Sequence, residues 1–242
     1  MDVNRLIERQ TSIIAQKIGC FPTGKLLDLG CGNGCIVQGY RERGVEAYGC
    51  DLSFKEGPHV AELAGKDLIR LVDPTDYVLP YPDAHFSVVV TNQVMEHVQD
   101  YGATLREIWR VLASGGICLS IFPPKFRLLE AHVDVPLGGA IQARWWLMLW
   151  AILGVRSPGQ EGLSFREVTT KNYSYLRQHT NYLSADEIRR QFDQVFSRYW
   201  FCEREFLNSK NRRSGFGAHL FSLPFMHGLY GTYWMRSIIA QK

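Results

Sequence analysis

The sequence predicts an α/β fold, a doubly wound and mostly parallel sheet with helices on both faces. From Lys25 onward, apolar runs alternate with amphipathic segments, which is typical of a parallel sheet covered by helices. The segment FSVVVTN at 86–92 is rich in β-branched residues, as strands buried on both faces are. The stretch LLDLGCGNGC at 26–35 joins an apolar run to a glycine turn and a helical segment, which indicates a ligand site at the end of a strand.

Length and composition favour one domain. With 242 residues, 46% of them hydrophobic, the chain can bury one sizeable core. We expect a single domain over 1–242. It comprises a core half at 25–122, an insertion at 123–183 that carries substrate contacts, and a C-terminal region at 184–242.

The net charge and the positions of the cysteines limit the classes of function that suit this sequence. The formal net charge is only +3, from 27 basic and 24 acidic residues, so we expect no nucleic-acid partner. The six cysteines are scattered, and reduced, buried thiols are expected. Because Cys and His residues do not cluster along the chain, the sequence predicts no metal site. The N-terminal segment has a helical pattern broken by charges, unlike a signal peptide, so we expect a cytoplasmic protein.

The secondary-structure elements follow from the same patterns. Ser184 and Glu187 form a capping-box pair that predicts a helix over 184–192. Strands are predicted at 25–30, 45–51, 67–72, 86–92 and 117–122, with helices at 34–43, 59–64 and 101–112. Two further strands are predicted at 197–206 and 215–223, joined by a basic turn at 208–214 and followed by an apolar tail.

The spacing of the glycine turn favours one kind of ligand. Gly30, Gly32 and Gly34 follow the pattern GxGxG, and the last glycine of the dinucleotide pattern GxGxxG is replaced by Cys35. Asp28 lies two residues before the turn, where a carboxylate repels a pyrophosphate but suits a cation. Asp51 ends the next strand, where a carboxylate can accept both hydroxyls of a ribose. The turn therefore predicts a cationic nucleoside rather than NAD.

Four motifs in the order found here resemble the class I S-adenosylmethionine-dependent methyltransferases, in the small-molecule, type 11-like group. They are LLDLGCGNG, the acid of YGCDLS, LPYPDAHFSVVVTNQVMEHVQD and LREIWRVLASGGICLSIF, and they cover Lys25 to Phe122. The resemblance implies a Rossmann-like, seven-stranded sheet, mostly parallel with an antiparallel last strand. It also implies S-adenosylmethionine as cofactor and a small-molecule, glycan or lipid-linked acceptor.

The resemblance also implies roles for individual residues. Asp28 would face the amino group of the methionine portion, and Asp51 the ribose hydroxyls. Asp73 or Asp76 would lie near the adenine, with Asp73 slightly favoured, and Asn92 near the sulfonium. The remaining implied cofactor contacts are Gly30, Cys31, Gly32, Gly34 and Leu52. Ser87 stands where many relatives carry an acid, which leaves the expected cofactor unchanged.

Two histidines are candidates for the chemistry. Methyl transfer needs an aligned acceptor and a deprotonated nucleophile. His132 lies in the insertion between Glu130 and Asp134, which could raise its pKa towards base strength, and we expect it to contact or deprotonate the acceptor. His97, after Glu96, follows the fourth strand and is either a second catalytic candidate or a packing residue.

Two apolar segments need a partner. WWLMLWAILGV at 145–155 is about half the ~20 residues that span a bilayer. It could be a lid, a homo-oligomer interface or, with the tail at 220–242 and the basic loop of Lys210, Arg212 and Arg213, a peripheral membrane contact. A protein that binds the cofactor but has lost catalysis and serves as a scaffold is the alternative function. The glycine spacing disfavours an NAD-dependent reductase.

Overall fold

The computed structural model describes residues 2–210 and 224–242, which form a seven-stranded sheet in the order β3-β2-β1-β4-β5-β7-β6. β7 runs antiparallel to both of its neighbours, and the pairs among β1 to β5 are parallel. The predicted fold class is therefore confirmed. The strands are β1 (Leu26–Leu29), β2 (Ala47–Asp51), β3 (Ile69–Leu71), β4 (Phe86–Asn92), β5 (Leu112–Phe122), β6 (Arg198–Phe201) and β7 (Arg236–Gln241).

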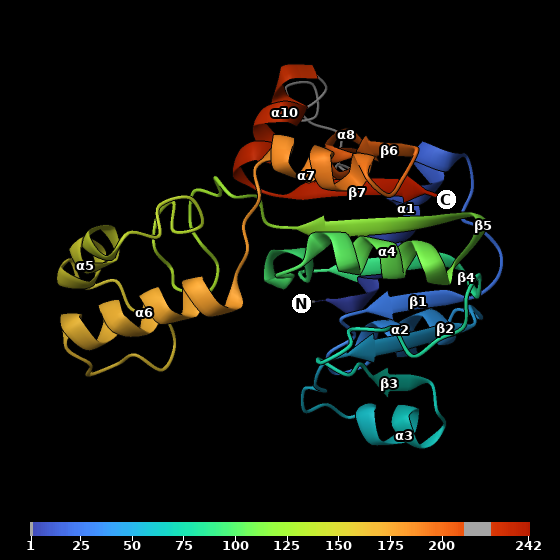
Figure 1. Ribbon diagram of the computed structural model, residues 1–242, viewed down its shortest axis with the longest axis horizontal. Helices are drawn as coiled ribbons and strands as arrows, with labels where there is room; N and C mark the ends of the chain where they lie inside the picture. Colours follow the sequence, from blue (N-terminus) through green and yellow to red (C-terminus); the bar gives the residue numbers. More distant parts are fainter. Residues whose placement is uncertain (1, 211–223) are drawn as a thin grey trace.

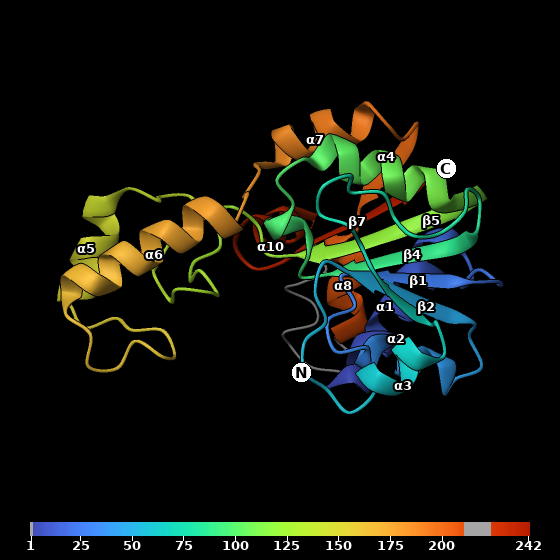
Figure 2. The ribbon, with the colours of Figure 1, turned by 60° about the horizontal axis from the view of Figure 1, so that its bottom comes forward.

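Helices cover both faces of the sheet (Figures 1 and 2). α4 and α7 lie on one face, while α1, α2 and α8 lie on the other. The helices are α1 (Val3–Ile18), α2 (Cys35–Arg41), α3 (Val60–Gly65), the 3₁₀ helix η1 (Met95–His97), α4 (Tyr101–Val111), α5 (Arg144–Ile152), α6 (Phe165–His179), α7 (Ala185–Asp193), α8 (Glu203–Lys210) and α10 (Pro224–Tyr233).

The core explains why β4 is a run of β-branched residues. Val89 packs into the cluster under α4, whereas Val88 and Val90 point into the cluster under α1 and α2. All three side chains are at most 1% exposed. Because successive side chains of a strand point to opposite faces, only a strand covered on both sides needs apolar residues at every position.

The first strand of the predicted C-terminal hairpin is shorter than expected. β6 ends at Phe201, and the predicted strand at 197–206 continues as helix α8. Cys202 and Phe206, four residues apart, are both buried in the cluster under α1, which is the period of a helix and not of a strand. The second predicted strand at 215–223 lies outside the described residues. β6 forms the edge of the sheet and pairs with β7, which lies within the predicted apolar tail.

β5 begins earlier than the strand predicted at 117–122. β5 begins at Leu112, directly after α4, although Ser114, Gly115 and Gly116 were expected to break the chain before the strand. The pairing of β4 with β5 shifts between Phe86 and Val88, and Gly115 there has φ 74°. The extra residues form a bulge, which glycine accommodates without steric cost.

The insertion at 123–183 forms a unit of its own beside the sheet. The chain leaves β5 at its carboxyl end, and α5 and α6 pack against each other beyond the sheet edge (Figure 1). The small core of this unit contains Val133, Val135, Leu147 and Leu176, each at most 2% exposed. Asn181 ties the unit back to the sheet, because its backbone N–H donates to the carbonyl of Glu96 over 2.7 Å. The insertion is thereby held against the end of β4.

The helical conformation of α8 predicts a specific stability response. Phe206→Ala should lower the free energy of unfolding by about 3–5 kcal/mol, because it opens a cavity between α8 and α1. Arg204→Ala, at an exposed position of the same helix, should change it by less than about 0.5 kcal/mol. Urea unfolding followed by circular dichroism measures both. Equal, small effects would contradict the packing of α8.

Candidate cofactor and acceptor site

The glycine turn leaves β1 at the carboxyl edge of the sheet. Gly30, Gly32 and Gly34 have φ angles of 81°, 53° and 74°, a region that side-chain-bearing residues rarely adopt. A Cβ at Gly30 would also lie 2.3 Å from the Val94 side chain that follows β4, and one at Gly34 would lie 2.6 Å from Leu63. The turn therefore needs glycine both for its conformation and for close packing against its neighbours.

Asp51 holds this turn against the end of β2. Its Oδ2 accepts the backbone N–H of Gly32 over 2.7 Å, and its Oδ1 accepts that of Ser53 over 3.3 Å. The carbonyl of Cys50 accepts the N–H groups of Gly30 and Cys31. Each carboxylate oxygen has two lone pairs, so Asp51 keeps acceptor capacity for ligand hydroxyls beside the turn.

Asp28 is the unusual group of the site. It is fully buried, and neither of its carboxylate oxygens has a hydrogen-bond partner among the described residues. Burial, and secondly the negative charge of Asp51, raise the pKa of Asp28 to about 8. A buried carboxyl group without a partner is costly, and a cationic ligand close to it would relieve that cost.

The other predicted cofactor contacts lie around the same edge. Val72 donates its N–H to the carbonyl of Asp51, so Asp73 leaves β3 next to the end of β2, while Asp76 lies three residues further along an exposed turn. Cys31 is buried, and burial raises the pKa of its thiol. Leu52 is half exposed, and Asn92 ends β4.

Glu96 and His97 follow β4 in η1. Glu96 is 1% exposed, and both of its carboxylate oxygens lack a hydrogen-bond partner among the residues described. Burial raises the pKa of Glu96 to about 7. The Nδ1 of His97 lies 2.6 Å from the carbonyl oxygen of His179 at the end of α6. Since a carbonyl only accepts, Nδ1 carries the proton, and Nε2 keeps its lone pair.

His132 is held by Glu130. The Nδ1 of His132 lies 2.6 Å from Glu130 Oε1, and Glu130 also accepts the hydroxyl of Tyr182 over 2.6 Å. The hydrogen bond to Glu130 raises the pKa of His132, although burial opposes it. Burial alone would raise the pKa of Glu130, but the hydrogen bonds from His132 and Tyr182 bring it below its usual value. The pair is therefore a carboxylate-oriented imidazole.

The fold brings the two candidate histidines together. The rings of His97 and His132 have centroids 4.9 Å apart, although one follows β4 and the other lies in the insertion. Tyr175 of α6 lies on the other side of His132, with ring centroids 5.5 Å apart. Sequence patterns do not reveal the positioning roles of Tyr175, His179 and Tyr182, because these residues reach the histidines only through the packing of α6 and the segment after it.

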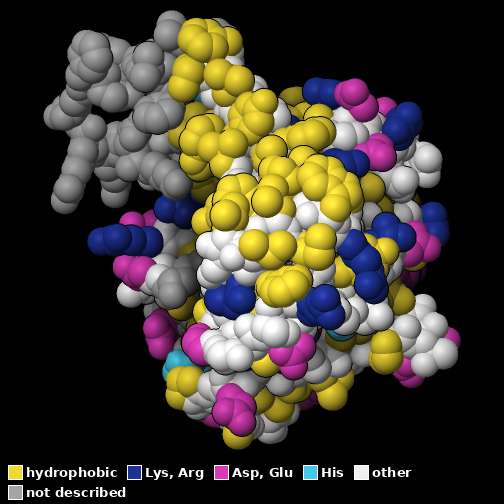
Figure 3. Space-filling view, turned by 90° about the vertical axis from the view of Figure 1, so that its left-hand side faces the viewer, with side chains coloured by type: hydrophobic (Ala, Val, Ile, Leu, Met, Phe, Trp, Pro, Cys, Tyr) yellow, Lys and Arg dark blue, Asp and Glu magenta, His cyan; other side chains and the backbone are white. Residues whose placement is uncertain are grey.

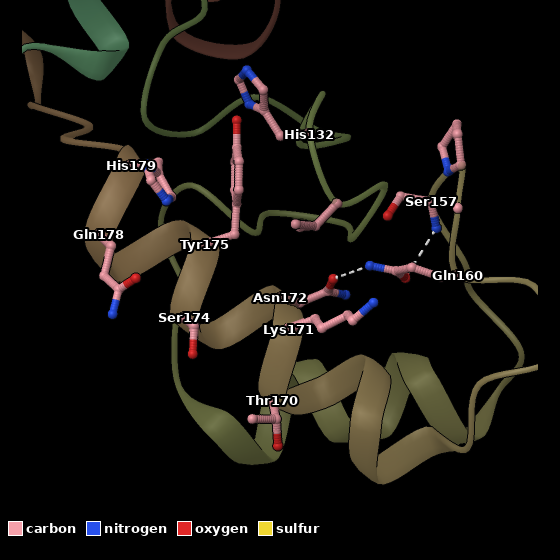
Figure 4. A pocket seen from close by; sticks show the side chains of 13 residues that line it. His132, Ser157, Gln160, Thr170, Lys171, Asn172, Ser174, Tyr175, Gln178 and His179 are labelled. Carbon is pink, nitrogen blue, oxygen red and sulfur yellow. Dashed lines mark hydrogen bonds between the residues drawn. The ribbon is translucent and has the colours of Figure 1, made fainter.

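A cavity of about 520 Å³ opens beside His132 (Figure 4). Its polar wall includes Gln160, which donates from Nε2 to Asn172 Oδ1 over 2.6 Å and accepts the N–H of Ser157 over 3.2 Å. The ring of Tyr175 points towards His132, at the end of the cavity opposite Thr170 (Figure 4). The volume suits a small organic molecule. Sequence reasoning placed substrate contacts in this insertion but did not identify the residues at 157–179 that line the cavity.

Residues 27–120 match the family described as "Methyltransferase domain". The fold is shared with a SAM-dependent methyltransferase from Archaeoglobus fulgidus, with a TM-score of 0.52 and 14% identity over 99% of this chain and 94% of that one. The core half of this chain therefore matches a methyltransferase domain and has the fold of an S-adenosylmethionine-dependent methyltransferase. Geranyl diphosphate C-methyltransferase from Streptomyces coelicolor A3(2) has a TM-score of 0.50 at 15% identity, over 98% of this chain and 80% of that chain.

Curated relatives match about half of this chain or less. Ubiquinone biosynthesis O-methyltransferase from Caulobacter sp. (strain K31) is 32% identical over 50% of this chain and 48% of the relative. Demethylmenaquinone methyltransferase from Deinococcus radiodurans is 35% identical over 48% of this chain and 54% of the relative. The chain thus spans about half, or less, of the curated relatives that it matches.

S-adenosylmethionine, the cofactor that the matched domain implies, fits the residues present. The unpartnered, buried carboxyl of Asp28 suits a cation, and the glycine turn leaves room for a ligand to approach the backbone. Asp51 retains lone pairs for ribose hydroxyls beside that turn. The role of each residue in binding remains a prediction.

The burial of Asp28 predicts a pH-dependent stability. In the cofactor-free protein Asp28 holds a proton up to about pH 8, whereas in the unfolded chain it loses that proton near its ordinary pKa. The folded state therefore binds more protons between these values, and its stability falls as pH rises through this window. Asp28→Asn should remove this loss, so its stability relative to wild type should grow by roughly 1 kcal/mol per pH unit between about pH 5 and 7.

Urea titrations across that pH range measure the effect. Glu8→Gln, which changes an exposed carboxylate on α1, is the control and should give a constant difference. The affinity of Asp28→Asn for S-adenosylhomocysteine should fall at least about tenfold, because the buried charge that favours the ammonium group is lost. A pH-independent stability difference together with unchanged affinity would contradict this role of Asp28.

Proposed function

We propose that this methyltransferase transfers a methyl group from S-adenosylmethionine to a hydroxyl of a small acceptor bound beside His132. The observation that carries the proposal is His132 in the wall of the cavity, held by Glu130 and next to His97, which follows β4. The curated relatives include enzymes named O-methyltransferases.

The cofactor, when bound, supplies an electrophilic methyl group on a sulfonium. The acceptor oxygen forms the new bond to the methyl carbon, the bond between sulfur and carbon breaks, and its electron pair stays on sulfur. The hydroxyl proton must leave the acceptor. Nε2 of His132 keeps a lone pair because Nδ1 donates to Glu130, so in the metal-free protein His132 can take that proton.

Loss of His132 should therefore separate turnover from cofactor binding. His132→Ala should lower kcat by about 10²–10⁴-fold, the usual contribution of a general base. Its affinity for S-adenosylhomocysteine should change less than threefold, because His132 lies in the insertion and not at the glycine turn. Methyl transfer to candidate small hydroxyl compounds and calorimetric titration give the two values.

Two results would contradict the proposal. Near-wild-type turnover of His132→Ala would remove His132 from the reaction. If wild-type protein binds S-adenosylhomocysteine but transfers no methyl group to any hydroxyl acceptor tested, the alternative of a catalytically inactive scaffold is favoured.

We further propose that the acceptor is amphiphilic or lipid-linked and that the insertion contacts the surface of a membrane. On α5 and just after it, Trp145, Met148, Leu149, Ile152 and Leu153 are 40–63% exposed. Phe225, Leu229 and Trp234, on or beside α10, are 43–61% exposed. Figure 3 looks onto this side of the molecule, where hydrophobic side chains gather with Lys and Arg at their border.

Charge supports a membrane surface as the partner. Residues 123–183 contain seven Lys and Arg and four Asp and Glu, so this segment alone has an excess of three positive charges, equal to the net charge of the whole chain. Exposed tryptophans beside arginines suit an anionic headgroup region. Among residues 2–210 and 224–242, no helix is long and apolar enough to cross a bilayer.

Vesicle flotation measures this contact. The protein should float with vesicles that contain anionic lipid, and Trp145→Ser combined with Leu153→Ser should reduce the bound fraction at least about fivefold by removing buried apolar area. Leu71→Ser, at an exposed apolar position on the opposite edge of the sheet, is the matched control. A wild-type protein that does not float and elutes as a dimer from a sizing column would assign the α5 surface to a second copy instead.

A further inference from the structure

Three metal-binding side chains meet between the core and the insertion. Glu96, His97 and His132 each offer one ligand atom, and these atoms all lie within 4.8 Å of one another. Only Glu96 and His97 are neighbours in the sequence. Because Cys and His residues do not cluster along the chain, the sequence alone predicts no metal site. The fold assembles the third ligand from the insertion.

Both imidazoles are oriented as metal ligands are. Nδ1 of His97 donates to the carbonyl of His179, and Nδ1 of His132 donates to the carboxylate of Glu130, each over 2.6 Å. Metal-binding histidines almost always donate their other ring N–H to a carbonyl or a carboxylate in this way. Tyr182 in turn orients Glu130 by donating its hydroxyl over 2.6 Å. In both rings Nε2 is left with a lone pair.

Glu96 is an independent indication of a ligand. Its side chain is 1% exposed, and neither oxygen has a partner in the described part of the chain. Its backbone is fixed, since its carbonyl accepts the N–H of Asn181. A buried carboxylate is normally paired or bound to a metal. Glu96 and Glu130 place two buried carboxyl groups beside the two imidazoles, and a divalent cation bound here would neutralise both carboxylates.

We propose that Glu96, His97 and His132 bind a divalent transition-metal ion of the zinc type at the acceptor end of the methyltransferase site. Two imidazoles and one carboxylate suit such ions and leave at least one coordination position open, as in catalytic zinc sites. Ligands at zinc lie roughly 3.4 Å apart in tetrahedral geometry, so the cluster would close by small side-chain rotations on binding.

The ion-binding site stands on its own geometry, whereas its part in the reaction rests on the proposed function. An acceptor hydroxyl at the open position would have its pKa lowered, and its proton would pass to solvent. The oxygen would then take the methyl group, while the electron pair of the broken bond stays on sulfur. His132 would act on the acceptor through the ion and not as a base.

Titration of chelator-treated wild-type protein with Zn²⁺, without cofactor or acceptor, tests the site. We expect one ion per chain with a Kd in the micromolar range or tighter. Glu96→Gln and His132→Gln should each weaken binding at least about 100-fold. Glu130→Gln, which removes the carboxylate that orients His132, should weaken it about 10- to 100-fold. His59→Gln, at the start of α3, is the control and should bind as wild type.

Co²⁺ gives a second measurement that needs no variant. Its visible absorption should show a low-coordinate site with nitrogen ligands in wild-type protein, and Zn²⁺ should displace it. Wild-type protein that takes up no stoichiometric Zn²⁺, or folded Glu96→Gln and His132→Gln that bind as wild type, would overturn the site. Protein that binds S-adenosylhomocysteine and Zn²⁺ but methylates no acceptor would refute the proposed function and leave the metal site standing.

Discussion

The site depends on the hydrogen bonds that join the glycine turn to the end of β2. Asp51 accepts the N–H of Gly32, and the carbonyl of Cys50 accepts those of Gly30 and Cys31, so the turn after β1 is fixed to the neighbouring strand. The parallel register of β1 with β2 and β4 brings their carboxyl ends to one edge. A cofactor therefore meets a preformed turn, and the residues after β4 face the same edge without further adjustment.

Buried carboxyl groups lie at two neighbouring strands of this edge. Asp28 at the end of β1 and Glu96 after β4 are almost completely buried, and neither has a hydrogen-bond partner among the described residues. Glu130, equally buried, instead accepts hydrogen bonds from the His132 ring, the Tyr182 hydroxyl and two backbone N–H groups. Since an unpaired buried charge costs several kcal/mol, positions that leave one unpaired are where a cationic ligand gains most. Glu130, whose oxygens have partners, therefore positions His132, whereas Glu96, whose oxygens have none among the described residues, is the group that can bind a ligand.

The insertion determines what lies opposite the cofactor edge. Its own small core around Leu147 and Leu176 holds α5 against α6, and Asn181 and His179 tie it to the end of β4. Trp146 donates its indole N–H to the carbonyl of Pro136 and is half-buried in this unit. Trp145, one residue earlier, is 62% exposed. The apolar run is therefore neither wholly a core helix nor wholly a surface helix, because one face fills the unit and the other remains uncovered.

The sequence by itself determined the sheet of the core half, the glycine turn and the acids at its ends, because each of these depends on residues close together in the chain. The strand predicted at 197–206 was too long, since Cys202 and Phe206 reveal their helical period only once α1 is packed beside them. Only the tertiary structure decided that His97 and His132 share one site with Glu96. These residues belong to a strand end and to a distant insertion, and local pattern carries no information about contacts that chain folding creates between them.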